Sequence, residues 1–276
     1  MRFPTWTAGG KMTQRIGIAG ITGRMGHLLV EEVQAAGAKL AGGIGRPGSD
    51  KPMPAGTRRF PDVAALAEAA DVVVDFTLAA TAQSHAAALA RAGTAWVLGT
   101  SGLSAADEEA VTDAARRIPV VHAANFSAGM TLVLALAEQM GAALPADAYD
   151  AEIVEMHHRQ KIDAPSGAAI AIGRAVAQGR GVVLDEVTES GRTGHTGPRK
   201  LGAIGFAALR GGQVVGEHTL IFAAATEHIE LTHRVFERRT FAVGAVRAAL
   251  WVAGRPAGLY SMADVLGIGG AGNDPA

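Results

Sequence analysis

The sequence predicts an α/β protein with two domains, one on an open, mainly parallel sheet and one of α+β type on a mainly antiparallel sheet. Three observations predict this: strand and helix patterns alternate in the first half, extended runs follow one another in the second half, and a glycine-rich turn joins the first strand to the first helix. The length of 276 residues is sufficient for two domains of ordinary size.

The first half alternates short buried strands with helical patterns. A strand at 15–19 ends in a glycine cluster, and apolar residues at Leu28, Leu29 and Val33 indicate a helix that continues to Gly37. Strands separated by helices form parallel βαβ units, because a parallel neighbour requires a crossover connection. The other expected strands are 39–44, 72–76, 95–98 and 120–123, and the other expected helices are 82–92 and 105–117.

The second half consists of extended runs with short connections. Residues 151–157 alternate, so that Ile153, Glu155 and His157 share one face of a strand. Gly211 and Gly212 predict a hairpin turn between the next two strands. Those strands and the last one are expected at 203–210, 213–222 and 227–235, and late helices at 242–252 and 262–266. We expect one domain over 12–127 and 238–276, and a second over 128–237.

Composition excludes several classes of protein. The chain has no cysteine, so it has no disulfide, thiolate metal site or cysteine nucleophile. With a net charge of −1 and no apolar run of about 18 residues, neither a nucleic-acid partner nor a membrane is expected. The stretch 1–11 lacks the apolar block of a secretory signal, and we interpret it as a disordered tail or a mis-set start, with Met12 opening the folded part. A cytoplasmic protein is the expectation.

The glycine-rich turn has the layout of a dinucleotide site. Gly20, Gly23 and Gly26 lie between the first strand and the first helix, where free amide groups can hold a pyrophosphate. Their spacing differs from the commoner G-x-G-x-x-G pattern, so a plain structural turn is the alternative. The flanking strand and helix favour the cofactor, and hence a Rossmann-like domain.

The end of the second strand favours NADPH over NADH. NAD sites usually place an acid there to hold the ribose 2′-hydroxyl, but this chain has Gly45 and Arg46, and no acid before Asp50. The guanidinium of Arg46 suits a 2′-phosphate, and Arg24 could add a second cation. The alternative is that Arg46 is a solvated loop residue.

The segment 155–167 carries the densest chemistry in the chain. His157 and His158 end a strand and point to opposite faces, which disfavours a shared metal ion. Lys161 follows closely, and Ser166 predicts a helix N-cap that leaves the next amide groups free for a carboxylate. An acid, His157 or Lys161, beside such a site suits reduction of a C=N or conjugated C=C bond. The alternative is a capped helix with solvated basic neighbours.

These residues resemble the 4-hydroxy-tetrahydrodipicolinate reductase family. The similarity runs in order from about Arg15 to Ile268, and the segment 157–167 is its most specific part. Further matching segments are 18–26, 75–77, 99–102, 123–127, 194–197, 204–206, 215–219 and 241–245.

The resemblance implies an enzyme of lysine and diaminopimelate biosynthesis that uses NAD(P)H to reduce 4-hydroxy-tetrahydrodipicolinate to tetrahydrodipicolinate with loss of water. It implies that His157 and Lys161 are catalytic and that His158, Gly167 and Ala168 bind the substrate carboxylates. The residues implied to bind the cofactor are Gly20, Ile21, Thr22, Gly23, Arg24, Met25, Arg46, Gly99, Thr100, Ser101, Ala123, Ala124, Asn125 and Phe126. It also implies a homotetramer joined through the second sheet, and hinges near Ser127 and Arg238.

The chain departs from the family at two positions. Ala168 replaces the usual threonine, which removes a hydroxyl donor to the substrate. Gly45 replaces the acid of NADH-using members.

Other functions remain as alternatives. An amine-releasing dehydrogenase could share the architecture, and a dinucleotide-binding sensor would lack the second anion site. A serine hydrolase is disfavoured, because 99–103 lacks the last glycine of a nucleophile elbow. His195 and His218 are expected to be structural.

Overall fold

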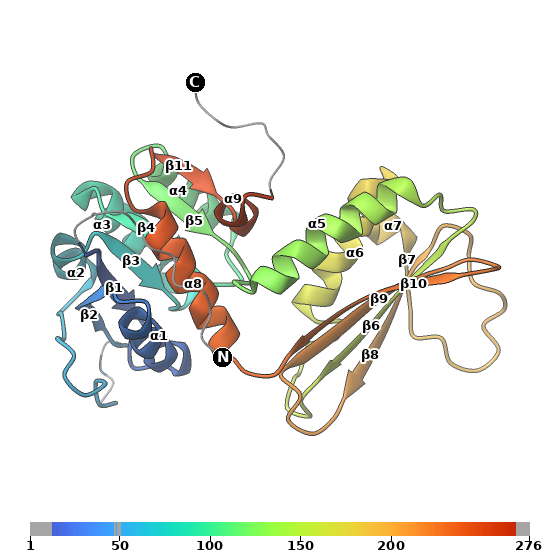
Figure 1. The fold of residues 1–276 in the computed structure, drawn as a ribbon, viewed down its shortest axis with the longest axis horizontal. Coiled ribbons are helices and arrows are strands. Elements are labelled where there is room, and N and C mark those ends of the chain that lie inside the picture. The colour runs from blue at the N-terminus through green and yellow to red at the C-terminus, as the bar shows by residue number, and fades with distance from the viewer. Residues whose placement is uncertain (1–12, 47, 49–50, 269–276) are drawn as a thin grey trace. The chain divides into compact units, whose positions relative to one another are not determined.

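The structure is a computed structural model that describes residues 13–46, 48 and 51–268. The expected N-terminal tail, Asp50 and the last residues of the chain lie outside the described residues. Contacts divide the chain into two compact units, one within 13–126 and 241–267 and the other within 127–240 (Figure 1). The chain passes between the units at Phe126–Ser127 and again at Thr240–Phe241.

The first unit contains a six-stranded sheet in which all neighbours are parallel. The strand order is β11-β5-β4-β3-β1-β2, so β2 lies on one side of β1 and the later strands follow on the other side, beginning with β3. Its strands are β1 (Arg15–Ala19), β2 (Lys39–Ile44), β3 (Val72–Asp75), β4 (Ala95–Leu98), β5 (Pro119–His122) and β11 (Gly258–Tyr260). The predicted parallel α/β sheet is confirmed, and β11 extends it beyond the predicted strands.

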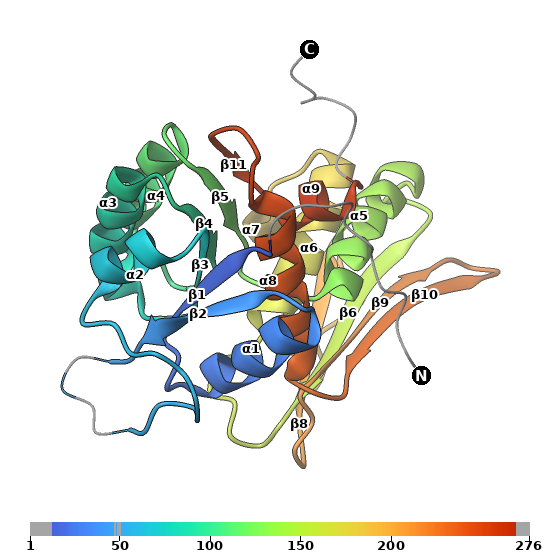
Figure 2. The same ribbon diagram turned by 60° about the vertical axis from the view of Figure 1, so that its left-hand side comes forward.

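Helices cover both faces of this sheet (Figure 2). One core packs Ile16, Ile18 and Val97 against α1, α8 and α9, and the other packs Trp96 and Leu98 against α2, α3 and α4. The bounds are α1 (Arg24–Ala35), α2 (Val63–Ala69), α3 (Ala82–Ala92), α4 (Ala105–Ala115), α8 (Arg239–Val252) and α9 (Met262–Leu266). The strands are apolar on both sides because both sides are covered.

The second unit contains a five-stranded mixed sheet in the order β10-β9-β6-β8-β7. Strand β9 is antiparallel to β10 and β6, whereas β8 is parallel to β6 and β7. The bounds are α5 (Ala128–Ala143), β6 (Asp150–His157), α6 (Gly167–Arg180), α7 (Leu184–Val187), β7 (Thr188–Ser190), β8 (Ile204–Arg210), β9 (Gly216–Ala223) and β10 (His228–Val235). Helices α5 and α6 pack against one face of this sheet (Figure 1).

The predicted hairpin at Gly211–Gly212 is wrong. Strands β8 and β9 lie on opposite sides of β6 and are not paired. The amide of Gly211 donates to the carbonyl of His157 at 2.9 Å, and the carbonyl of Gly212 accepts from Arg159 at 3.3 Å. The glycines therefore continue the pairing along β6 before the chain crosses the end of that strand. Two glycines permit a turn, but core packing decides which strand lies beside which.

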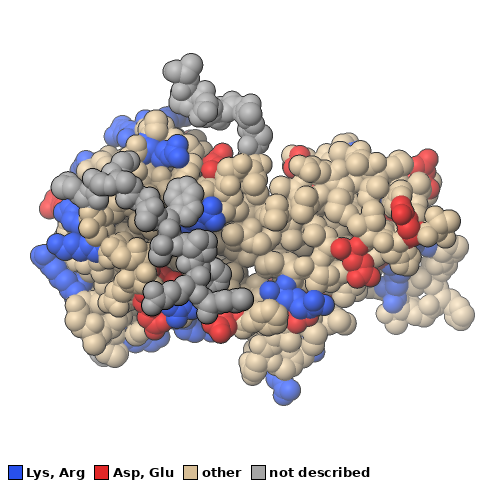
Figure 3. Space-filling view, in the orientation of Figure 1, with Lys and Arg blue, Asp and Glu red and all other residues tan. Residues whose placement is uncertain are grey.

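Charge is distributed without a broad single-sign surface on the face that Figure 3 shows, where Lys and Arg are interspersed with Asp and Glu. None of the helices among the described residues combines the length and the apolar character that a membrane crossing requires.

Candidate functional site

The carboxyl edge of the parallel sheet brings the predicted cofactor residues together. The chain leaves β1 toward β2 on one side and reaches β3 on the other, and open α/β sheets bind ligands at such a switch point. The segments 20–25, 45–46, 99–101 and 123–126 follow β1, β2, β4 and β5, respectively, so all of them lie at this edge.

The glycine loop leaves room for phosphate at the start of α1. Gly20 has φ +85°, a conformation that favours glycine. A Cβ atom on Gly26 would come within 2.4 Å of the carbonyl oxygens of Gly20 and Ile21, so only glycine lets the helix approach the loop so closely. The close fit of helix and loop is the one expected of a dinucleotide site.

The amide groups at the start of α1 are the ones suited to hold a pyrophosphate. The amides of Gly20 and Ile21 both donate to the carbonyl of Ile44, and the amide of Gly23 donates to the carbonyl of Gly20. Gly23 has no side chain with which to cap α1, so the amides of Arg24 and Met25 keep the unsatisfied character of a helix start. The residues present therefore fit the diphosphate of a dinucleotide.

The loop after β3 completes this edge and was not among the predicted cofactor residues. The buried carboxylate of Asp75 accepts from the backbone and the hydroxyl of Thr77, at 3.0 and 2.6 Å, and lies 2.7 Å from Nδ1 of His85. The ring of Phe76 packs near Phe126 with 5.5 Å between centroids, and a Cβ on Gly99 would come within 2.5 Å of that ring. The motif at 75–77 was the signal in the sequence that could have identified this loop.

The end of β2 lies next to the glycine loop. Gly45 is close enough to Thr22 that a Cβ at position 45 would lie 3.1 Å from that side chain. Any residue larger than glycine would press on Thr22, which is consistent with the missing acid. Arg46, the next residue, is exposed.

In the second unit, strand β6 places His157 on its buried face beside Glu155. The two side chains point to the same side because strand residues alternate, and Nδ1 of His157 lies 2.6 Å from Oε2 of Glu155. Only 9% of His157 and 1% of Glu155 is exposed. His158 is the first residue after β6, and its Nδ1 is a buried atom with no hydrogen-bond partner among the described residues.

Helix α6 begins next to this pair. Ser166 is its N-cap, as predicted, and the hydroxyl of Ser166 accepts from the amide of Ala169 at 3.2 Å. The amides of Gly167 and Ala168 have no partner within the helix, and Gly167 faces open space. A carboxylate is the natural ligand of such a helix start, because both the amide donors and the helix dipole favour an anion.

Lys161 lies in the loop between β6 and α6. Its ammonium donates to both carboxylate oxygens of Asp163 at 2.9 Å, and this hydrogen bond holds the pKa of Asp163 below its usual range. Among the residues that the structure describes, no three His, Asp or Glu side chains are grouped so as to hold a metal ion.

His218, which was expected from the sequence to be structural, also lies beside this group of residues. It lies on β9, its ring is 5.2 Å from that of His157, and its Nε2 is 3.1 Å from the hydroxyl of Ser166. Burial, with repulsion from His157, lowers the pKa of His218 to about 4. The ring is therefore neutral near pH 7.

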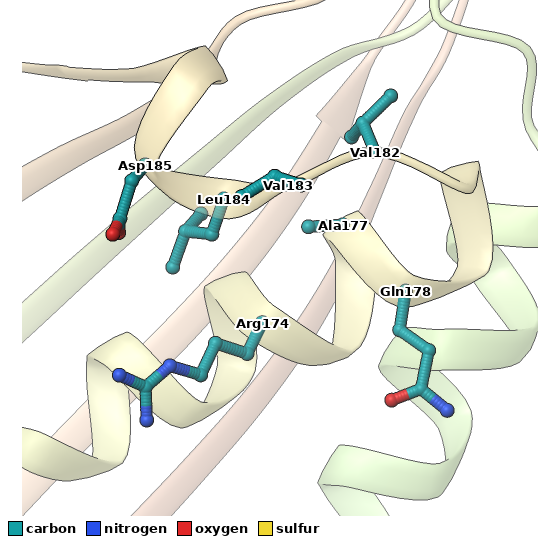
Figure 4. Close-up of a pocket in the computed structure, with 7 residues that line it drawn as sticks. All are labelled: Arg174, Ala177, Gln178, Val182, Val183, Leu184 and Asp185. Carbon is teal, nitrogen blue, oxygen red and sulfur yellow. The ribbon is translucent and has the colours of Figure 1, made fainter.

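A hollow in the second unit lies away from this group, between the C-terminal half of α6 and α7 (Figure 4). Of the residues that line it, Arg174 and Asp185 are charged and the others are uncharged. The catalytic candidates are at the opposite end of α6, so we do not assign the reaction to this hollow.

The fold and the edge just described define a class of protein. A parallel sheet with a glycine loop at its switch point, joined to a second unit in which a histidine lies beside an open helix start, is typical of dinucleotide-dependent oxidoreductases.

The comparisons with known proteins define the particular family. The pattern described as "Dihydrodipicolinate reductase, N-terminus" matches residues 14–126, and the one described as "Dihydrodipicolinate reductase, C-terminus" matches 129–266. The chain therefore belongs to the dihydrodipicolinate reductase family, whose members are oxidoreductases of lysine and diaminopimelate biosynthesis.

Relatives agree with this assignment, and solved structures share the fold. The chain is 68% identical to the 4-hydroxy-tetrahydrodipicolinate reductase of Granulibacter bethesdensis over 92% of this chain and 97% of that protein, and 64% identical to that of Gluconacetobacter diazotrophicus over the same shares. A dipicolinate-bound dihydrodipicolinate reductase from Paenisporosarcina has the same fold, with a TM-score of 0.75 at 23% identity over 91% of this chain and 98% of that one. GenD2 from gentamicin A biosynthesis, in complex with NAD, follows with a TM-score of 0.59 at 16% identity over 95% and 94%.

Proposed function

We propose that this chain reduces 4-hydroxy-tetrahydrodipicolinate to tetrahydrodipicolinate, with loss of water, and that it prefers NADPH. The observation that carries the proposal is the position of His157 beside the open start of α6, in a chain of this family. A dicarboxylate bound there would lie next to an imidazole and an ammonium, the groups that protonate a substrate as it is reduced.

The substrate carboxylates are assigned to His158 and to the amides of Gly167 and Ala168. The buried, unpartnered Nδ1 of His158 and the unsatisfied amides of the helix start are donors that an anion would satisfy. His157 would give a proton to the substrate from Nε2, since Nδ1 is held by Glu155. Lys161 would leave Asp163 to act as the second donor.

The cofactor is assigned to the carboxyl edge of the parallel sheet. Arg24 and Met25 would hold the diphosphate through their amides, with the rest of 20–25 enclosing it, and Arg46 would hold the 2′-phosphate. The segments 99–101 and 123–126 would complete the site at the ends of β4 and β5. When bound, NADPH supplies the hydride.

We include a homotetramer in the proposal. The face of the second sheet that α5 and α6 leave uncovered carries Val154, Met156, Leu209 and Ile221, and half of Leu209 is exposed. An uncovered face with several apolar side chains favours association with further copies of the chain.

The test is NADPH oxidation with enzymatically generated substrate, in wild type and in variants. We expect kcat to fall roughly 10²- to 10⁴-fold in His157→Gln and in Lys161→Ala, because each loses a proton donor. His195→Gln and Lys200→Ala, which change exposed residues of the loop before β8, are the matched controls. Turnover equal to wild type in the first two variants would remove the proposed acids.

The same assay examines the cofactor preference. Arg46→Ala is expected to raise the KM for NADPH about tenfold and to leave the KM for NADH unchanged, because it removes one charge-assisted contact to the 2′-phosphate. Arg91→Ala, at the end of α3, is the control. Wild-type enzyme with no preference for NADPH would contradict the assignment of Arg46.

A further inference from the structure

Glu155 is a buried carboxylate that joins three elements of the second unit. Its Oε2 accepts from Nδ1 of His157 on the same strand at 2.6 Å, and its Oε1 accepts from the amide of Ser166 at the start of α6 at 3.1 Å. Arg210 on β8 donates to both oxygens at 2.9 Å. Neither the sequence pattern nor the family resemblance assigned a role to Glu155 or Arg210.

These donors keep Glu155 ionised in spite of its burial. Burial alone raises the pKa of Glu155, but hydrogen bonds from Arg210, His157 and the Ser166 amide outweigh it, and the pKa lies below its usual range. A buried carboxylate is stable only when it is paired and hydrogen-bonded in this way. An ionised carboxylate can only accept, so the Nδ1 that faces it carries a proton.

The arrangement determines which nitrogen of His157 exchanges protons. Because Nδ1 is held by Glu155, Nε2 remains for the substrate. Nε2 lies beside the backbone of Gly216, and a Cβ atom on residue 216 would come within 3.1 Å of it. Glycine at the start of β9 therefore leaves Nε2 uncovered. A carboxylate that fixes the tautomer of a catalytic imidazole is a recurrent device in enzymes.

The second oxygen of the same carboxylate, Oε1, holds the start of α6, where the anion site is proposed. Since Glu155 also holds the amide of Ser166, it determines how far the Nε2 of His157 lies from the amides of Gly167 and Ala168. Arg210 supports this loop independently, because it donates to the carbonyl of Asp163 at 2.6 Å. One group thus sets both the proton donor and the carboxylate site.

We propose that Glu155 is the positioning residue of the reaction: held by Arg210, it orients His157 for proton transfer and aligns the start of α6 with it for the substrate carboxylate. The inference rests on the proposed role of His157. Glu155 itself is not expected to contact the substrate.

The charged and titratable groups around His157 come from every neighbouring element. Arg210 of β8 and His218 of β9 flank it, Lys161 follows in the loop, and His233 of β10 acts on His218. His218 is neutral near pH 7, because its pKa is lowered to about 4. Glu155 is therefore the negatively charged group that contacts the ring of His157 directly.

The test compares Glu155→Gln with Glu152→Gln in the full-length enzyme. Glu152 is on the same strand but on its opposite face, where it pairs with Arg192, so it is a matched control. In Glu155→Gln we expect kcat to fall at least about tenfold with the KM for NADPH unchanged, and the pH profile of kcat to change. Imidazole ¹⁵N spectra should show His157 losing its fixed tautomer.

A double-mutant cycle separates positioning from loss of structure. In the His157→Gln background, Glu155→Gln should lower kcat less than twofold further, because the proton donor that it orients is already gone, and the loss of its hold on the start of α6 should appear in the KM for the substrate instead. Reductions that multiply, or a single Glu155→Gln variant with wild-type kcat and pH profile, would overturn the inference. Wild-type kcat in His157→Gln alone would instead refute the proposed role of His157.

Discussion

Ala168 lies in the proposed substrate site, at a position where the family resemblance implies a threonine. It stands in the first turn of α6, where its amide remains available but its side chain offers no hydroxyl. A threonine there would add one donor to a bound carboxylate. Donors to charged groups contribute somewhat more than neutral ones, so the missing hydroxyl has a measurable expected effect.

We predict that Ala168→Thr tightens binding of the dicarboxylate. The added hydrogen bond, worth about 1 kcal/mol, should lower the Kd for pyridine-2,6-dicarboxylate about fivefold in isothermal titration calorimetry.

The control is Ala168→Val, which has the shape of threonine without the hydroxyl. It should bind the dicarboxylate no more tightly than wild type. Equal gains in the two variants would mean that the added bulk acts through packing, and no gain in Ala168→Thr would place the carboxylate elsewhere.

Strand β6 is the element on which the proposed substrate site depends. Its alternating pattern predicted a strand with Glu155 and His157 on one face, and the structure has both buried there. Its neighbours could not be predicted in the same way. The two glycines at 211 and 212 suit a hairpin between β8 and β9. In the structure, however, β8 pairs with one edge of β6 and β9 with the other, so that β6 separates them.

Strand β9 gives the second unit a predicted sensitivity to acid. Burial lowers the pKa of His218 to about 4 and also lowers that of His233 on the neighbouring strand. Below the ordinary value of about 6.5, the unfolded chain binds protons that the folded chain does not. The stability that the neutral His218 contributes is therefore fully present above pH 6.5 and is lost as the pH falls toward 4. Below pH 4 the free energy of unfolding changes no further on account of His218.

We predict that the free energy of unfolding falls by about 2 kcal/mol between pH 7 and pH 5 on account of His218. Urea unfolding followed by circular dichroism at both values measures it. His218→Gln should flatten this dependence although it also loses the contact with Ser166, whereas His195→Gln, at an exposed position, should leave it unchanged. The same pH dependence in all three proteins would show that His218 is not the cause.

At the scale of the whole molecule, each unit has a separate hydrophobic core. The parallel sheet is covered by helices on both faces, whereas α5 and α6 cover one face of the mixed sheet. The uncovered face is the reason for the proposed tetramer.

We predict that Leu209→Glu breaks the tetramer into smaller species. A carboxylate at this half-exposed position would be buried without a partner on association, which disfavours the interface. Light scattering coupled to size exclusion measures the mass. Leu201→Glu, at an exposed position in the loop before β8, serves as the control. A monomeric wild-type protein, or an unchanged tetramer in the variant, would contradict the proposed surface.

The sequence by itself determined the local features: the glycine loop before α1, the strand ending at His157, the cap at Ser166 and the family. Each depends on residues close together in the chain, where backbone geometry and periodicity act directly. Only the tertiary structure decided that Arg210 reaches Glu155 and that His218 reaches Ser166, because these partners are 55 and 52 residues apart. Their approach depends on the order of strands around β6, which packing of the whole unit sets and no short pattern encodes.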